Sequence, residues 1–115
     1  MPRNMSFALT TNQFKEKTKT VTRRFGWSFL KPGDVICGVE KAMGLKKGEK
    51  IKKLGLIRVI SVRDECLCDI TQADCIREGF PEMTPDQFVG FLISHDKTGD
   101  TNPMSVVNRI EFEYL

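Results

Sequence analysis

The sequence has no long hydrophobic run and no apolar leader. Charged residues interrupt every apolar stretch well before the roughly 20 residues that a transmembrane helix needs. Residues 1–6 carry no stretch typical of a secretory signal. These absences argue against membrane and secreted proteins, so we expect a cytoplasmic protein with no membrane partner.

The chain also has few residues that build metal or disulfide frameworks. It contains four cysteines and one histidine, His95. A reducing compartment argues against disulfides, and zinc sites favour paired ligands at Cys-x2–4-Cys spacing. Cys66 and Cys68 are separated by a single residue, and Cys75 stands apart. We interpret the thiols as buried small hydrophobes and predict no metal and no cofactor.

No internal repeat, low-complexity tract or Pro/Ser-rich linker divides the chain. Its 115 residues, 40% hydrophobic and 29% charged, suit one globular domain. We therefore predict a single domain over residues 1–115, in which residues 1–5 form a disordered extension.

What the sequence does contain is positive charge gathered in two places. Residues 13–24 and residues 46–53 each hold five basic residues and one glutamate, a net charge of +4 apiece. Because the whole chain carries +3, the remainder carries −5. A basic face concentrates phosphate-bearing partners, which favours a nucleic acid or nucleotide ligand. For residues 46–53 the alternative is a solvated hairpin tip, where lysines protect strand edges from aggregation.

The hydrophobic pattern predicts strands first, then helices, then a closing strand. Residues 54–62 have apolar side chains on both faces, which predicts a central strand. Capping-box sequences begin helices at Thr71 and Thr84, and Pro32-Gly33 suits a type II turn. The other predicted elements are strands at 6–9, 19–25, 35–40 and 109–114 and a short helix from 10 or 11 to 17. This order predicts an α+β fold, a small barrel or barrel-like sheet with two to three short helices.

The densest group of reactive side chains lies in residues 17–24, Lys-Thr-Lys-Thr-Val-Thr-Arg-Arg. A hydroxyl beside an amine can form a nucleophile with its own base. The amine must then be neutral, which burial or neighbouring cations promote. In a regular strand, however, Lys19 and Thr22 face opposite sides and meet only across a bend. The alternative is an exposed strand in which threonines alternate with basic residues.

This run, together with residues 30–35, 61–63 and 77–81, resembles the ASCH domain family. The resemblance extends from about residue 6 to residue 115 and implies a PUA-like β-barrel. The family signature Gly-x-Lys-x-x-Glu-x-Arg falls on Lys17, Lys19, Thr22 and Arg24. Lys19 and Arg24 match the signature, whereas Lys17 replaces the glycine and Thr22 replaces the glutamate.

A threonine at that position resembles the small bacterial ASCH enzymes that hydrolyse the acetyl amide of N4-acetylcytidine. The resemblance implies a catalytic set of Lys19, Thr22 and Glu78. Thr22 would be the nucleophile and Lys19 its base, while Glu78 would orient these groups or polarise the leaving amine. Arg24 would anchor a phosphate or an oxyanion.

Two further side chains are weaker candidates for substrate binding. Trp27 could stack on a base or cover the open end of the barrel, and Arg63 could line the cleft or lie on the surface. Candidate contacts to nucleic acid are the basic side chains of the two clusters: Lys17, Arg23, Lys46, Lys47, Lys50, Lys52 and Lys53.

Three functions remain open at this point. The first is an amidohydrolase acting on an N4-acylated cytidine or a related nucleoside. The second is a non-catalytic module that binds RNA or a modified cytidine nucleoside. The third is a small regulatory or host-interaction protein that merely shares the fold.

Overall fold

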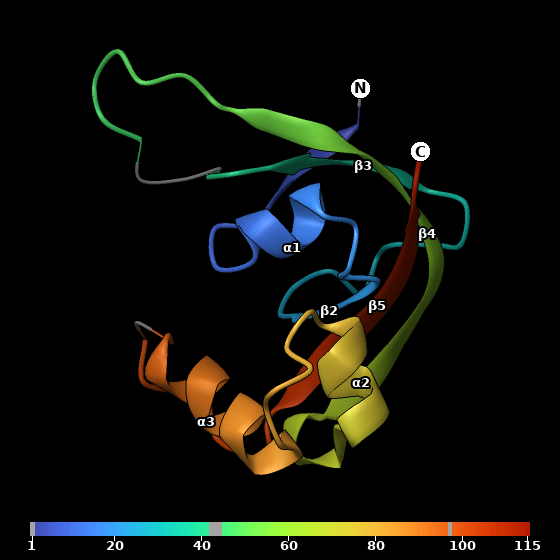
Figure 1. The fold of residues 1–115 in the computed structure, drawn as a ribbon, viewed down its shortest axis with the longest axis vertical. Coiled ribbons are helices and arrows are strands. Elements are labelled where there is room, and N and C mark those ends of the chain that lie inside the picture. The colour runs from blue at the N-terminus through green and yellow to red at the C-terminus, as the bar shows by residue number, and fades with distance from the viewer. Residues whose placement is uncertain (1, 42–44, 97) are drawn as a thin grey trace.

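The computed structural model describes residues 2–41, 45–96 and 98–115 (Figure 1). They form a five-stranded sheet in the order β1-β3-β4-β5-β2, with three α-helices and one 3-10 turn. In chain order the elements are β1 (Arg3–Ser6), α1 (Thr11–Lys15), β2 (Val21–Arg24), β3 (Val35–Val39), β4 (Lys53–Cys66), η1 (Leu67–Asp69), α2 (Gln72–Arg77), α3 (Pro85–Ser94) and β5 (Val106–Tyr114). The predicted α+β class with a barrel-like sheet is confirmed.

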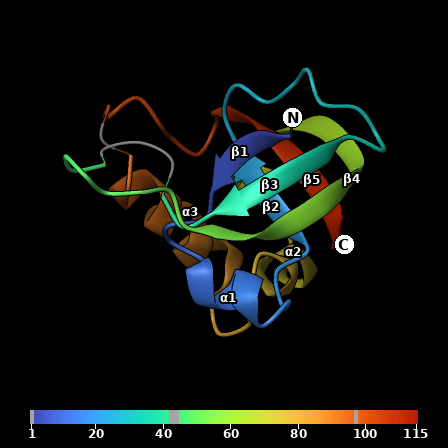
Figure 2. The same ribbon diagram turned by 90° about the horizontal axis from the view of Figure 1, so that it is seen from above.

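The sheet curls into a partial barrel around α1, and α2 and α3 lie together toward its other end (Figures 1 and 2). β1 pairs with β3 in parallel, and the other pairs are antiparallel. Gly38 in β3 lets Phe14 of α1 approach the sheet closely, because a Cβ there would lie 2.5 Å from the Phe14 ring. β1 and β2 are the two edges of the sheet, and Arg24 joins them by donating a hydrogen bond to the Ser6 carbonyl oxygen.

β4 is the central strand, as predicted, but its two faces do not alternate throughout. Its register against β5 shifts between Val59 and Ser61, which leaves Ile60 as an unpaired bulge residue. Val62 therefore packs against the core cluster that contains Val59, whereas Leu56 and Ile60 are exposed. The regular alternation expected over residues 54–62 is interrupted for this reason.

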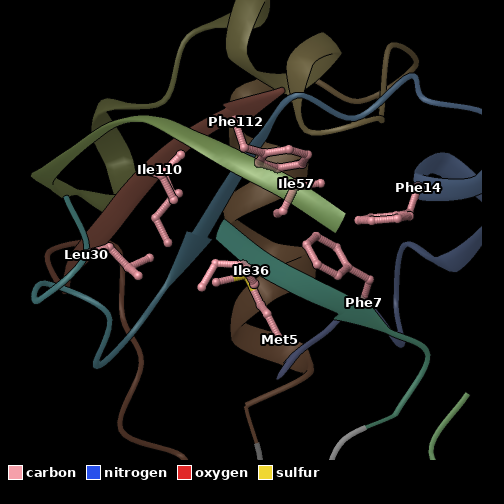
Figure 3. Close-up of a cluster of buried hydrophobic side chains, with 9 residues drawn as sticks. Met5, Phe7, Phe14, Leu30, Ile36, Ile57, Ile110 and Phe112 are labelled. Carbon is pink, nitrogen blue, oxygen red and sulfur yellow. The ribbon is translucent and has the colours of Figure 1, made fainter. Parts of the chain in front are cut away.

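Two clusters of buried side chains form the core. The first fills the curled sheet (Figure 3) and consists of Met5, Phe7, Phe14, Leu30, Ile36, Ile57, Val59, Ile110 and Phe112. The second lies beneath α2 and α3 and consists of Leu67, Ile70, Cys75, Phe80, Phe88, Val89 and Val107.

The prediction of a disordered extension is wrong for residues 3–5. β1 begins at Arg3, and Met5 is 1% exposed within the first core cluster. The backbone of this segment pairs with β3, from Arg3 opposite Ile36 to Ser6 opposite Val39. The strand reads Arg-Asn-Met-Ser, so the sequence offers only one apolar residue to reveal it.

The four cysteines are all free thiols, but they are not all buried. Cys37 and Cys75 are buried, as predicted, whereas Cys66 is half-buried and Cys68 is exposed. The last two lie where β4 ends and η1 begins, at the edge of the second core cluster. Within the described ranges no helix is long and apolar enough to cross a membrane.

Candidate functional site

A cavity of about 250 Å³ lies where the two core clusters meet. Its walls are mainly apolar and come from the segment after β1, from the loop after α2 and from α3. Four side chains that the sequence predicts for catalysis or substrate binding line it together, namely Lys19, Thr22, Arg24 and Glu78. The other lining residues are Ser6, Phe7, Ala8, Leu9, Thr10, Arg23, Phe80, Phe88, Phe91 and Leu92.

Lys19 reaches the cavity because it lies just before β2 rather than within it. The backbone of the next residue, Thr20, is held on both sides. Its N–H donates to the Arg77 carbonyl oxygen at 2.7 Å, and its carbonyl oxygen accepts from the Phe112 N–H at 3.0 Å. The Tyr114 hydroxyl donates to the Lys19 carbonyl oxygen. The strand alternation that separates Lys19 from Thr22 therefore does not apply.

The Lys19 ammonium is buried against Glu78, the residue that ends α2. Lys19 Nζ lies 2.6 Å from Glu78 Oε1 and 3.0 Å from the Glu78 carbonyl oxygen. Burial lowers the pKa of Lys19, and the nearby Arg24 and Arg23 guanidiniums act in the same direction. The ion pair with Glu78 opposes this effect, but the net shift of the Lys19 pKa is downward.

Arg23 is the central cation of a buried ionic network. Its Nη1 donates to Glu78 Oε2 at 3.0 Å, its Nε donates to Glu65 Oε2 at 2.9 Å, and its Nη2 donates to Asp74. The side chain is 0% exposed. The prediction that Arg23 contacts nucleic acid is therefore wrong, because three carboxylates already occupy its guanidinium in the interior.

Asp74, in the first turn of α2, binds three guanidinium groups. It accepts hydrogen bonds from Arg109 at 2.7 and 3.0 Å, from Arg77 at 2.9 Å and from Arg23. These hydrogen bonds, that of Arg109 above all, hold the pKa of Asp74 well below its usual range, although burial acts against them. The Thr71 hydroxyl oxygen caps the helix by accepting from the Asp74 N–H at 3.1 Å, as predicted.

Sequence reasoning missed Glu65, Asp74 and Arg109. Asp74 stood in the predicted capping box, which gave it a local role. Arg109 begins the strand predicted at residues 109–114, where charged residues alternate with apolar ones, and this pattern is typical of an exposed side chain. It is buried because its side chain reaches Asp74, which lies 35 residues away in the chain. No local pattern signals such a pairing.

The inner part of the network has equal numbers of positive and negative side chains. Its three cations and three carboxylates are Lys19, Arg23, Arg109, Glu65, Asp74 and Glu78. Two exposed arginines, Arg77 and Arg63, bind Asp74 and Glu65 from outside. Among the described residues, no buried side-chain nitrogen or oxygen lacks a hydrogen-bond partner. Charged groups can be buried only when they are paired and hydrogen-bonded in this way.

Thr22 and Arg24 also line the cavity and contact each other. Thr22 is buried, and its Oγ1 accepts a hydrogen bond from Arg24 Nε at 3.2 Å. The Arg24 guanidinium also lies 4.7 Å from the centre of the Phe7 ring. Burial lowers the pKa of Arg24 to about 10, which still leaves a cation at neutral pH. Both Nζ hydrogen bonds of Lys19 go to Glu78, so Thr22 and Lys19 share the cavity without a direct bond.

The remaining predicted site residues lie outside the cavity. Trp27 stacks on Phe29, with their ring centres 5.5 Å apart. It also packs against the first core cluster, as expected for a residue that covers the barrel. Arg63 is exposed and donates to Glu65 at 3.3 Å, and Lys17 is exposed. The loop lysines Lys46, Lys47, Lys50, Lys52 and Lys53 are exposed too. Their loop projects from the end of the molecule opposite α2 and α3 (Figure 1).

Acidic and thiol side chains do not gather into a metal site in the part of the chain that the structure describes. No group of three or more His, Cys, Asp and Glu side chains there could hold a metal ion. The carboxylates of the network are engaged by arginine and lysine instead.

Comparison with known proteins adds to the description of the fold. No family model matches the sequence, and neither does any curated protein. The crystal structure of protein EF3133 from Enterococcus faecalis V583, described as a DUF984 protein, has a similar fold with a TM-score of 0.67. The match covers 100% of this chain and 80% of that one, at 14% identity. The likeness establishes a shared fold and carries no inference about activity.

The network predicts a large loss of stability when Asp74 is neutralised. Asp74→Asn leaves Arg23 and Arg109 short of a buried counter-charge, so we expect the free energy of unfolding to fall by about 3–5 kcal/mol at pH 7 in urea titrations. Asp86→Asn is the matched control, because Asp86 occupies the first turn of α3 and is exposed. It should lower stability by about 1 kcal/mol at most.

The same pair of variants gives a pH test. A carboxyl whose pKa is lower in the folded state stabilises the protein above its unfolded pKa of about 3.9. That contribution is lost as the pH falls through the folded value. The difference between wild type and Asp74→Asn should therefore shrink as the pH is lowered below about 4. If the two free energies of unfolding differ as little at pH 7 as they do below pH 4, the network does not stabilise the fold.

Proposed function

We propose that the chain is an ASCH-type protein with a PUA-like barrel that binds an N4-acylated cytidine nucleoside in the cavity and hydrolyses its amide. The observation that carries this proposal is the meeting of Lys19, Thr22 and Glu78 in one cavity, although Lys19 and Glu78 are 59 residues apart in the chain. These are the residues that the resemblance implies. A chance resemblance in sequence would not require these three residues to lie close together in space, so their proximity supports the proposal independently.

The cavity offers two environments that suit such a ligand. Phe80, Phe88 and Phe91 give it an apolar wall against which a planar base can lie. The same cavity is lined by Thr22, which carries a hydroxyl, and by Lys19, which carries an amine. Burial lowers the pKa of Lys19 and so raises the fraction of neutral amine available to accept a proton.

The proposed reaction proceeds through an acyl-enzyme. Thr22 Oγ1 attacks the acyl carbon while its proton passes to the neutral Lys19 amine. The bond between the acyl carbon and N4 then breaks, and Lys19 returns the proton to N4, which releases cytidine. Water hydrolyses the threonine ester in the second half of the reaction, giving a carboxylic acid and restoring Thr22.

The contacts of Glu78 and Arg24 suggest positioning roles in this scheme. Glu78 Oε1 is held by Lys19 and Oε2 by Arg23, so this carboxylate orients the base rather than carrying protons. Arg24 Nε donates to Thr22 Oγ1 and thereby aims the nucleophile. Its Nη2 is committed to the Ser6 carbonyl oxygen, which leaves Arg24 less free to anchor a phosphate than the resemblance implied.

Incubation with N4-acetylcytidine, followed by chromatography for cytidine, tests the proposal. We expect wild type to release cytidine, and Thr22→Ala or Lys19→Ala to slow release by about a hundredfold or more, because each removes a group that makes or breaks bonds. Thr18→Ala is the control, since Thr18 is exposed and outside the cavity. Undiminished turnover in Thr22→Ala would remove Thr22 as the nucleophile.

The pH dependence of turnover identifies the base. A lysine that acts as base must lose its proton first, so the rate should rise with pH along the titration of Lys19. Burial lowers the Lys19 pKa from 10.5, so we expect the midpoint of the rise to lie below that value. A rate that shows no rise with pH anywhere below 10.5 would exclude Lys19 as the base.

A second candidate function is RNA binding through the lysine-rich loop, residues 46–53. The observation that favours it is that all five lysines of the loop are exposed and lie away from the cavity. A nucleoside hydrolase does not need them, whereas a phosphate backbone does.

Salt dependence tests this second function. Replacing the five loop lysines with glutamine should weaken binding to single-stranded RNA. It should also reduce the slope of log K against log salt by about 0.7 for each phosphate that the loop no longer neutralises. Lys15→Gln and Lys31→Gln, which alter exposed lysines outside the loop, serve as controls. An unchanged slope in the loop variant would sink the hypothesis.

A further inference from the structure

A second hollow, of about 190 Å³, adjoins the cavity along α3. The two share three lining residues, Leu9, Arg23 and Leu92, so a ligand in one borders the other. This second hollow contains none of the residues placed in the proposed chemistry, namely Lys19, Thr22 and Glu78. Its surroundings suit binding rather than reaction.

Phe25 marks the second hollow as a binding surface. It follows β2 directly, lines the hollow and is 56% exposed. Within the described ranges no other aromatic ring stacks on it, in contrast to Phe29, which is 50% exposed but stacks on Trp27. Leu67 and Val107 supply an apolar floor beside the Phe25 ring. An exposed ring beside apolar side chains is a platform for the face of another ring.

His95 supplies a polar group in the same hollow. Its Nδ1 lies 2.8 Å from the Phe91 carbonyl oxygen, so in the neutral ring Nδ1–H donates there. The other nitrogen, Nε2, is then left as an acceptor for a ligand hydroxyl. His95 also packs on the Phe91 ring at 4.4 Å, and Phe91 lines the first cavity. A few polar groups among apolar ones are typical of small-molecule sites.

We propose that the second hollow binds the ribose of the nucleoside whose acylated base occupies the first cavity. This inference rests on the proposed function. In a cytidine the sugar is attached at N1, across the pyrimidine ring from N4. A ligand whose amide reaches Thr22 therefore directs its ribose out of the first cavity, toward a neighbouring surface.

The chemistry of the second hollow suits that sugar. A ribose has an apolar C–H face for the Phe25 ring and hydroxyl groups that can donate to His95 Nε2. The resulting specificity is for a nucleoside over the free base.

Calorimetric titration of two ligands, N4-acetylcytidine and N4-acetylcytosine, tests this inference. Both are titrated into the Thr22→Ala protein, and chromatography confirms that the amide stays intact. We expect the nucleoside to bind more tightly than the base. Adding Phe25→Ala should lower the affinity for the nucleoside by about threefold to tenfold and leave the affinity for the base unchanged.

Phe29→Ala in the same background is the matched control, because it removes an equally exposed ring that lies outside both hollows. It should alter neither affinity. The inference is overturned if Phe25→Ala has no effect, or if it weakens both ligands alike.

The failure of this inference is distinguishable from failure of the proposed function. Turnover by wild type with equal affinity for both ligands would overturn the ribose site and leave the hydrolase standing. Phe25-dependent binding of the nucleoside without any turnover would support the ribose site and overturn the hydrolase. Failure of both ligands to bind would overturn both.

Discussion

Arg23 is buried among three carboxylates, and these ion pairs tie β2 to β4 and to both ends of α2. Glu65 comes from β4, Asp74 from the first turn of α2, and Glu78 from the residue that ends α2. A buried guanidinium that lost one of these partners would be strongly destabilising, whereas exposed pairs contribute little. β2 must therefore keep a definite position relative to α2. Lys19 lies just before β2 and Glu78 just after α2, so fixing these two elements relative to each other brings the two side chains together.

The location of the candidate site follows from the same arrangement. α2 and α3 cover a second apolar cluster, while the curled sheet encloses the first. The polar network lies between an apolar barrel and an apolar helical layer, and the cavity opens beside it. This position explains why the pKa of Lys19 is lowered although a carboxylate lies within hydrogen-bond distance. It also places apolar side chains of α3 in the same cavity as Lys19 and Thr22.

The proposed catalytic set illustrates how far sequence reasoning extends. Resemblance to a family singled out Lys19, Thr22 and Glu78, while strand periodicity alone argued against a meeting of the first two. The objection fails because β2 begins at Val21, two residues after Lys19. Arg23 shows the opposite error, since its place in a basic run predicted an exposed contact to nucleic acid. Charge along the chain does not reveal which cations will be neutralised in the interior.

Features that depend on neighbouring residues could be predicted from the sequence alone. These include the starts of α2 and α3, where Thr71 and Thr84 cap the helices, and the turn after Lys31. The hydrophobic run also identified β4 as the central strand. Three other features depend on contacts between distant residues: the strand at residues 3–6, the bulge in β4 and the ion pair between Asp74 and Arg109. The physical reason is that capping and turn formation are local. Burial of a charge or pairing of an edge strand depends instead on partners far away in the chain, which no local pattern records.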